Sequence, residues 1–407
     1  MSKKLIIITS VVLGLFLLAL VGYYFIIQGN ESSPDGPLSK FKNFFPFGGS
    51  DLPAPTSSGK ENENRPPEQS SQTNFTQKLR KLSMEPVAGA TILDSKAGSI
   101  VRHIEKATGH IFETELFSPR QARISNTTIP TVYDALWGNK SLSLVARYLK
   151  EDDQTIDTYS LTIKEVATST ENTISGIPFP ANIKDVAAFG GNLFYLVETS
   201  DYSVGYTSSW SGAGRKQIWS SAIKELLSQY VNSRTVALTT KPEADVFGFL
   251  YFVDTSSGQV RQILGKLNSL STLVSPDASQ VLYMNQKNGL QMSVYNLSSK
   301  STSLLSPITF PEKCLWSSKD KNVIYCAVPK EFLGAESLVS WYKGMSSYTD
   351  DIWKYDIKNN TSSMIEDLSA DSGEPIDVIK PILSDNEQYL IFINKRDNSL
   401  WSLDLNK

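Results

Sequence analysis

The chain has 407 residues, which is long for a single compact domain of ordinary size. Its formal net charge of −3 argues against nucleic acid as a partner, because phosphate binding requires a basic surface. Its two cysteines exclude a disulfide-dense scaffold.

The N-terminal segment is predicted to be a transmembrane helix. Residues 5–27 carry no charge and follow the lysines at 3 and 4. A helix of this length rises about 35 Å, and the hydrocarbon core of a bilayer is about 30 Å thick. A cleaved signal peptide is the alternative, but its apolar region would be about 7–15 residues long and end in small residues. The paired lysines predict a cytoplasmic stub at 1–4, with the rest of the chain outside the cytoplasm.

Residues 28–78 are predicted to be a disordered linker. Pro, Ser, Asn, Gly and Glu dominate this segment, and it shows neither a helix nor a strand period. Such a composition buries too little apolar surface to offset the entropy of ordering the chain. We therefore expect a flexible tether between the membrane and a globular part that begins near Leu79.

The second half of the chain repeats a phrase of two strands. Each copy has a short apolar run with an aromatic residue, followed by a second run that begins or continues with an aromatic one. In the first copy the two runs start at Val281 and Val294. In the second they start at Val323 and Trp353, and in the third at Leu390 and Trp401. Self-similarity at about 40–50 residues is typical of a β-propeller, in which each repeat forms one four-stranded blade.

The chain between 79 and 407 is predicted to be an all-β, seven-bladed β-propeller. The expected blades are 84–122, 123–176, 177–230, 231–266, 267–305, 306–369 and 370–407. The strands are least clear between 177 and 266, which leaves a count of six open, and Ser221–Tyr230 fits a short helix.

The last predicted blade ends after its third strand. An open ring would leave exposed sheet edges, which invite aggregation. We therefore expect a strand just before the first blade, within Lys81–Val87, to supply the missing outer strand.

Three blades begin with a turn that resembles the repeat of TolB-type β-propellers, also called the PD repeat. The clearest copy is Ser275-Pro276-Asp277, and looser copies start at Ser317 and Ser384. The proline presets φ for a tight turn, and the aspartate can accept hydrogen bonds from nearby backbone amides. The resemblance covers 267–407 and implies the fold rather than one function, because such propellers serve as periplasmic adaptors, enzyme appendages and surface receptors.

No catalytic residue, metal site or cofactor is predicted. The two histidines, His103 and His110, flank a probable hairpin turn and lack an obvious third ligand. Ser221 and Lys224 have the spacing of a Ser-Lys pair, but the companion motifs are missing. We therefore do not expect an enzyme.

Cys314 and Cys326 flank a predicted hairpin turn that is centred on Asp320. Residues at equal distances from the centre of an antiparallel turn lie opposite each other, within the separation that a disulfide tolerates. A location outside the cytoplasm would permit the bond to form. The alternative is two buried thiols that are offset by a slip in register.

Two enlarged loops are the predicted binding surface. Tyr195 and Trp219 are 24 residues apart and Tyr325 and Trp353 are 28 apart, whereas the matching pair is nine or ten apart in compact copies. Loops between second and third strands share one face of a propeller, and aromatic side chains on such loops suit protein or glycan binding. The alternative is that the loops pack over the ring opening. The candidate binding residues are Tyr202, Tyr206, Trp210, Arg215, Phe332, Trp341, Tyr342 and Tyr348.

These features together predict a single-pass membrane protein whose propeller lies outside the cytoplasm. The leading hypothesis is a non-catalytic module that binds or scaffolds an envelope protein or a cell-wall glycan. One alternative is a sensor or accessory subunit of a larger membrane complex. Another is a propeller enzyme that acts on glycan or peptide, which would need clustered carboxylates at the central opening.

Overall fold

The computed structural model describes residues 76–407 except 126, 153, 165–171, 332 and 335. The chain divides into 1–67 and 68–407, and every described residue belongs to the second unit. The predicted cytoplasmic stub, transmembrane helix and nearly all of the linker lie outside the described residues. Within the described part, no helix is long and apolar enough to cross a membrane.

The described unit consists of antiparallel sheets, so the all-β prediction is confirmed. Three four-stranded sheets follow one another along the first part of the chain. Their strands are β2 (Val87–Ser95), β3 (Gly98–Glu105), β4 (Ile111–Glu115) and β5 (Gln121–Ser125); β6 (Val132–Gly138), β7 (Ser143–Leu149), β8 (Ile156–Lys164) and β9 (Thr173–Pro178); and β10 (Ile183–Phe189), β11 (Asn192–Glu198), β12 (Ser203–Ser209) and β13 (Lys216–Ser221).

A seven-stranded sheet comes next in the chain. Its strands are β14 (Leu226–Asn232), β15 (Thr235–Thr240), β16 (Phe247–Asp254), β17 (Val260–Val274), β18 (Gln280–Gln286), β19 (Leu290–Asn296) and β20 (Ser301–Leu305). The 15-residue β17 pairs with β16 through its first part and with β18 through its second part. Near its middle, Lys266 and Ser269 have positive φ values of 58° and 54°, so the strand turns there without a separate loop.

Two more four-stranded sheets complete the unit. Their elements are the 3-10 helix η2 (Pro311–Lys313), β21 (Cys314–Trp316), β22 (Val323–Pro329), α2 (Ser337–Tyr342), β23 (Asp350–Asp356) and β24 (Thr361–Glu366); then α3 (Leu368–Ser372), β25 (Val378–Leu383), β26 (Tyr389–Asn394), β27 (Leu400–Asp404) and β1 (Leu79–Lys81).

The short helix predicted at Ser221–Tyr230 is wrong, because β13 ends at Ser221 and β14 begins at Leu226. Leu226 and Leu227 have a spacing that suits a helix. In the structure β14 pairs with β15, and its Leu226 and Tyr230 pack in a buried cluster with Leu238. Packing between sheets therefore outweighs the local pattern.

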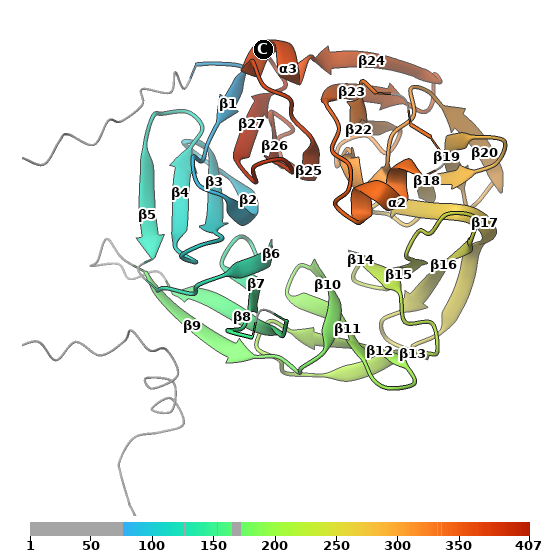
Figure 1. The fold of residues 1–407 in the computed structure, drawn as a ribbon, viewed down its shortest axis with the longest axis horizontal. Coiled ribbons are helices and arrows are strands. Elements are labelled where there is room, and N and C mark those ends of the chain that lie inside the picture. The colour runs from blue at the N-terminus through green and yellow to red at the C-terminus, as the bar shows by residue number, and fades with distance from the viewer. Residues whose placement is uncertain (1–75, 126, 153, 165–171, 332, 335) are drawn as a thin grey trace, which may run out of the picture. The chain divides into compact units, whose positions relative to one another are not determined.

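The sheets of the described unit are arranged around a common centre (Figure 1), and the strands β2, β6, β10, β14 and β25 lie nearest to it. The second strand of a sheet is covered on both faces, as in β22, where six of seven residues are buried. The outermost strand is polar, as in β20, where four of five residues are exposed. This difference explains why second strands give the strongest apolar runs in the sequence.

The last sheet has the order β1-β27-β26-β25, so a strand from the N-terminal side of the first sheet forms its outer edge. Leu79 pairs with Leu403, and Lys81 pairs with Trp401. The pairing segment is 79–81 rather than 81–87, because the chain must leave the outer edge after Lys81 and reach the centre at Val87, where β2 begins.

The hydrophobic core consists of separate clusters between neighbouring sheets. One cluster joins Ile104 of β3 to Trp137 of β6 and Leu144 of β7, and another joins Val101 to Leu400 of the last sheet. The inner strands approach each other closely. A Cβ at Gly89 of β2 would lie far inside van der Waals contact of the Ala135 carbonyl oxygen.

Candidate functional site

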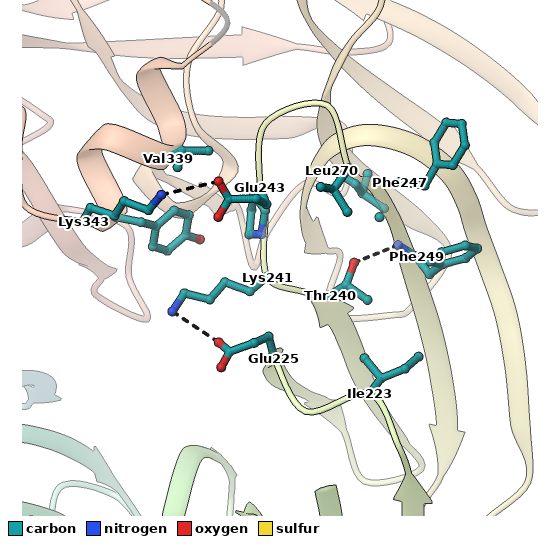
Figure 2. Close-up of a pocket in the computed structure, with 14 residues that line it drawn as sticks. Ile223, Glu225, Thr240, Lys241, Glu243, Phe247, Phe249, Leu270, Val339 and Lys343 are labelled. Carbon is teal, nitrogen blue, oxygen red and sulfur yellow. Dashed lines mark hydrogen bonds and ion pairs between the residues drawn. The ribbon is translucent and has the colours of Figure 1, made fainter. Parts of the chain in front are cut away.

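A pocket of about 540 Å³ lies between α2 and the turn that joins β15 to β16 (Figure 2). The turn contributes Val246, and Phe247 and Phe249 follow from the start of β16. The helix contributes Val339 and Tyr342. The pocket therefore brings together segments that are about a hundred residues apart in the sequence.

The walls of the pocket are mostly apolar and rest on strands. Leu270 of β17 forms part of the wall beside Gly248. A Cβ at Gly248 would lie 2.5 Å from the Leu270 Cβ, so only glycine permits this approach. The backbone N–H of Phe249 donates a hydrogen bond of 2.9 Å to Thr240 Oγ1 (Figure 2), which fixes the start of β16.

Two apolar side chains at the mouth of the pocket face solvent. Val246 is 54% exposed and Phe247 is 58% exposed. Exposed apolar side chains beside a concavity mark interaction sites more often than isolated surface residues do.

Two ion pairs stand at the rim of the pocket (Figure 2). Lys343 lies 3.4 Å from Glu243, and Lys241 lies 3.5 Å from Glu225. All four side chains are at least 47% exposed. Exposed pairs of this kind add little to stability, so these charges remain available to a bound partner.

The helix that forms one wall is fixed by a buried ionic cluster. Lys313 Nζ lies 2.5 Å from Asp350 Oδ2 and 2.5 Å from Asp377 Oδ1, and none of the three side chains is exposed. The indole N–H of Trp341 in α2 donates to both Asp377 oxygens at 3.1 Å. Burial raises the pKa of Asp350 to about 6, although the Lys313 ammonium opposes this. The cluster therefore ties α2 to the inner ends of two sheets.

Tyr342 connects the pocket to a shielded carboxylate. Its hydroxyl donates a hydrogen bond to Glu312 Oε1, which also accepts one of 2.5 Å from Ser271 Oγ. The other oxygen, Glu312 Oε2, is buried without a partner among the described residues. Burial raises the pKa of Glu312, and burial together with Glu312 raises the pKa of Tyr342.

The structure separates the candidate residues of the first predicted loop from the pocket. Tyr206 lies within β12, and the guanidinium of Arg215 stands 3.9 Å from its ring centroid. Trp210 is 5% exposed and donates to the Gly190 carbonyl at 3.0 Å. Tyr202 is 51% exposed, in the turn before β12. The prediction of an exposed aromatic surface is therefore wrong for Trp210.

The 24 residues between Tyr195 and Trp219 contain a whole strand, so the prediction of one enlarged loop there is wrong. Trp219 lies on β13, the fourth strand, and not on the third. The third strand is β12, whose sequence SVGYTSS has no apolar run. Residues 210–215 therefore join β12 to β13, at the opposite end of the sheet from the turn between the second and third strands. Trp210 and Arg215 therefore do not share a face with the second predicted loop, whereas Tyr202 lies in a turn between a second and a third strand.

The second predicted loop does join a second strand to a third, β22 to β23, and it contains α2. It folds inward, as Figure 1 shows for α2. Trp341 is 6% exposed and Tyr348 is 8% exposed, so both are core residues and not an exposed surface. Tyr342 lines the pocket. Phe332 lies outside the described residues.

Cys314 and Cys326 are register partners in β21 and β22, and a disulfide joins them. His103 and His110 flank the turn between β3 and β4, and His103 is buried, with 2% exposure and a centroid distance of 5.5 Å to the Phe112 ring on which it stacks. Burial lowers the pKa of His103 to about 4. Within the described ranges, no group of three metal-ligating side chains is placed to hold an ion.

Polar contacts also link neighbouring inner strands near the centre. Asp185 Oδ2 of β10 accepts bonds from the Ser228 backbone N–H at 2.5 Å and the Ser228 hydroxyl at 2.7 Å. Burial raises the pKa of Asp185 to about 6. Arg147 Nη2 donates to the Ile183 carbonyl at 3.1 Å. Sequence reasoning missed these residues, because nothing local distinguishes them from other polar residues at the start of a strand.

A comparison with protein-family models gives no match, and a comparison with curated proteins gives none either. Solved structures do match. Oligogalacturonate lyase from Vibrio parahaemolyticus has a TM-score of 0.54 at 8% identity, over 80% of this chain and 93% of that chain. An oligogalacturonate lyase in complex with manganese has a TM-score of 0.50 at 11% identity, over 79% and 98%. TolB from Acinetobacter baumannii has a TM-score of 0.42 at 12% identity, over 77% of this chain and 78% of that chain. At these identities the likeness shows the fold alone, and that fold is a β-propeller.

Proposed function

We propose that the protein is a membrane-tethered β-propeller that binds another protein, without catalysis, at the pocket between α2 and the β15–β16 turn. The exposed apolar lip of Val246 and Phe247 is the observation that carries this proposal. Exposure of these apolar side chains to water is unfavourable in free energy, and a bound partner that covers them removes this exposure.

The composition of the pocket supports a protein partner over a glycan. A sugar ring needs many hydrogen-bonding groups around it, whereas the walls here are mostly Phe, Val, Ile and Leu side chains, with Thr240 and Tyr342 as the uncharged polar ones. The rim carries two acidic and two basic side chains. A protein segment that inserts one apolar side chain and carries charges on either side fits both features.

The proposal includes seven blades and closure of the ring by β1. Dividing β17 at its middle gives two four-stranded groups, β14–β17 and β17–β20, in place of the seven-stranded sheet. With the five other sheets this makes seven groups of equal size. Pairing of β1 with β27 supports the closure.

The membrane anchor at 5–27, the linker at 28–78 and the location outside the cytoplasm are part of the same proposal. The Cys314–Cys326 disulfide supports an oxidising compartment. Protease added to intact spheroplasts should cut the linker at 28–78 and release the folded part, while a tag at the N-terminus survives. A linker that stays uncut until the membrane is broken would reject the orientation.

Selection of random phage-displayed peptides on the full-length chain tests the binding function. Enriched peptides should share an apolar residue flanked by charged ones. They should still bind Leu304→Asp, which changes a 61% exposed residue on the outer strand β20, and should be lost from Phe247→Asp. Equal binding to both variants rejects the pocket as the site.

A second candidate, an enzyme that acts on glycan or peptide, is favoured by one observation. Tyr342 lines the pocket and its hydroxyl bonds Glu312, whose pKa is raised by burial. A carboxyl group of this kind suits general acid–base chemistry. Incubation with defined oligosaccharides and peptides, followed by mass spectrometry, tests it. Turnover that is lost in Glu312→Gln supports the enzyme, and the absence of turnover rejects it.

A further inference from the structure

We propose that the inner strands β25, β2 and β6 form a second site, separate from the pocket, which binds a phosphate group. The three strands lie side by side at the centre (Figure 1). Lys380 of β25 reaches across β2, where Nζ donates to the Ala88 carbonyl at 2.8 Å, and it also bonds Asp134 Oδ1 of β6. One lysine therefore spans three sheets.

Two further cations gather at the same place. Arg147 is the register partner of Asp134, and its Nη1 lies 3.9 Å from Asp134 Oδ2. Lys106 is held by its own backbone, because its N–H donates to the Pro86 carbonyl at 2.9 Å and its carbonyl accepts from the Val132 N–H at 2.8 Å. Val132 is the first residue of β6, the strand that carries Asp134. The backbone of Lys106 therefore lies beside the start of β6.

The donors of this cluster are incompletely used. The Lys106 ammonium has no ion pair or hydrogen bond with any residue of the described part of the chain. Arg147 Nε is buried and has no partner within the same residues. A buried donor without a partner, such as Arg147 Nε, is rare in folded proteins, and an ion that completes its hydrogen bonding is one explanation.

The charges of the cluster fit a phosphate dianion. Lys106, Arg147 and Lys380 carry three positive charges, and Asp134 carries one negative charge. The next carboxylate, Asp185, interacts electrostatically with Arg147 and adds a second negative charge, which leaves the cluster with a net charge of +1. A phosphate group carries about −1.5 to −2 at neutral pH and accepts several charge-assisted hydrogen bonds at once.

The cluster is open to a small solute. The Lys380 side chain is 41% exposed, Asp134 is 31% exposed and Arg147 is 14% exposed. An arginine that is largely buried beside a more open lysine gives both a fixed planar donor and a mobile one. A free phosphate ion and a phosphate monoester both offer the chemistry that this arrangement recognises.

Calorimetric titration of the full-length chain tests the site, with inorganic phosphate and glycerol 3-phosphate as probes and acetate as the carboxylate comparison. Lys106→Gln should weaken phosphate binding by about tenfold or more, because it removes a charged donor. The control Lys96→Gln changes an exposed lysine in the β2–β3 turn and should bind as the natural chain does. Arg147→Gln should weaken binding as well.

Binding of inorganic phosphate supports a free-ion site, and binding of glycerol 3-phosphate alone supports a site for a phosphate ester. Three results would overturn the proposal: no saturable binding of either probe, equal affinity for acetate, or Lys106→Gln and Lys96→Gln that bind alike. Thermal unfolding of each variant verifies that the fold is kept.

Discussion

Lys313 Nζ lies 2.5 Å from Asp377 Oδ1, and neither side chain is exposed to solvent. Lys313 ends η2, just before the first strand of one sheet, and Asp377 directly precedes β25, the first strand of the next sheet. Asp377 also accepts the indole N–H of Trp341. This one ion pair therefore joins two neighbouring sheets and fixes the helix that forms a wall of the pocket.

Replacing Asp377 by Asn should lower the free energy of unfolding by about 3 kcal/mol, because the buried ammonium loses one of its two carboxylates. Urea unfolding measures this. The matched control Lys241→Gln removes an exposed ion pair at the rim and should change stability by about 1 kcal/mol or less. Equal effects of the two substitutions would contradict the role of the cluster.

Replacing both Cys314 and Cys326 by Ser should lower the free energy of unfolding by about 2–3 kcal/mol, because the bond closes a short loop of the unfolded chain. Denaturant unfolding with and without reductant measures this. In reductant, the free energy of unfolding of the natural chain should fall to that of the double variant. The free energy of unfolding of the variant should not change when reductant is added. A natural chain that is unaffected by complete reduction would count against the bond as a stabilising feature.

Gly89→Ala should lower the free energy of unfolding by about 2 kcal/mol, because the added methyl group overlaps the Ala135 carbonyl of the neighbouring inner strand. Thermal unfolding compared with Gly191→Ala provides the test. A Cβ at Gly191 meets no atom within 4 Å, so this control should stay close to the natural chain. A tolerated Gly89→Ala would mean that β2 and β6 do not pack as closely as described.

Protonation of His103 should make stability fall in acid. Its pKa is lowered by burial from 6.5 to about 4, so the unfolded chain binds the proton more readily than the folded one. The stabilisation is complete above pH 6.5 and is lost as pH falls from about 6.5 to about 4, with a total of about 3 kcal/mol.

The measurement for His103 is the difference in unfolding free energy between the natural chain and His103→Gln at several pH values. Asp185 and Asp350 have raised pKa values, which act in the opposite direction, but they are present in both proteins and cancel in the difference. A difference that does not change with pH would show that His103 titrates alike in both states.

The sequence predicts the turns at the start of the later sheets well, because their chemistry is local. Asp277 accepts from the Ser275 hydroxyl at 2.7 Å and from the Ser279 N–H at 3.0 Å, as proline-aspartate turns do. Asn386 takes the same role in the last sheet, where it accepts from the Ser384 hydroxyl at 2.8 Å. Turns whose hydrogen bonds join residues close in the sequence can therefore be predicted without a structure.

The binding surface could not be predicted in the same way. β12 has no apolar run, because Gly205 allows Phe194 and Trp219 to pack where a side chain would otherwise stand. Without such a run, the sequence predicts an enlarged loop where the structure has the strand β12. The pocket joins Phe247 to Tyr342, which only the arrangement of the sheets brings together.

The most direct test of the account is a cross-link from a selected peptide to the chain. The peptide carries a benzophenone at its apolar position, and mass spectrometry identifies the residues that it labels. The account predicts labels within 241–249 and 339–343, which vanish in Phe247→Asp and persist in Leu304→Asp. Labels that gather at 202–215 or on the outer strands would contradict the pocket as the place where this protein meets its partner.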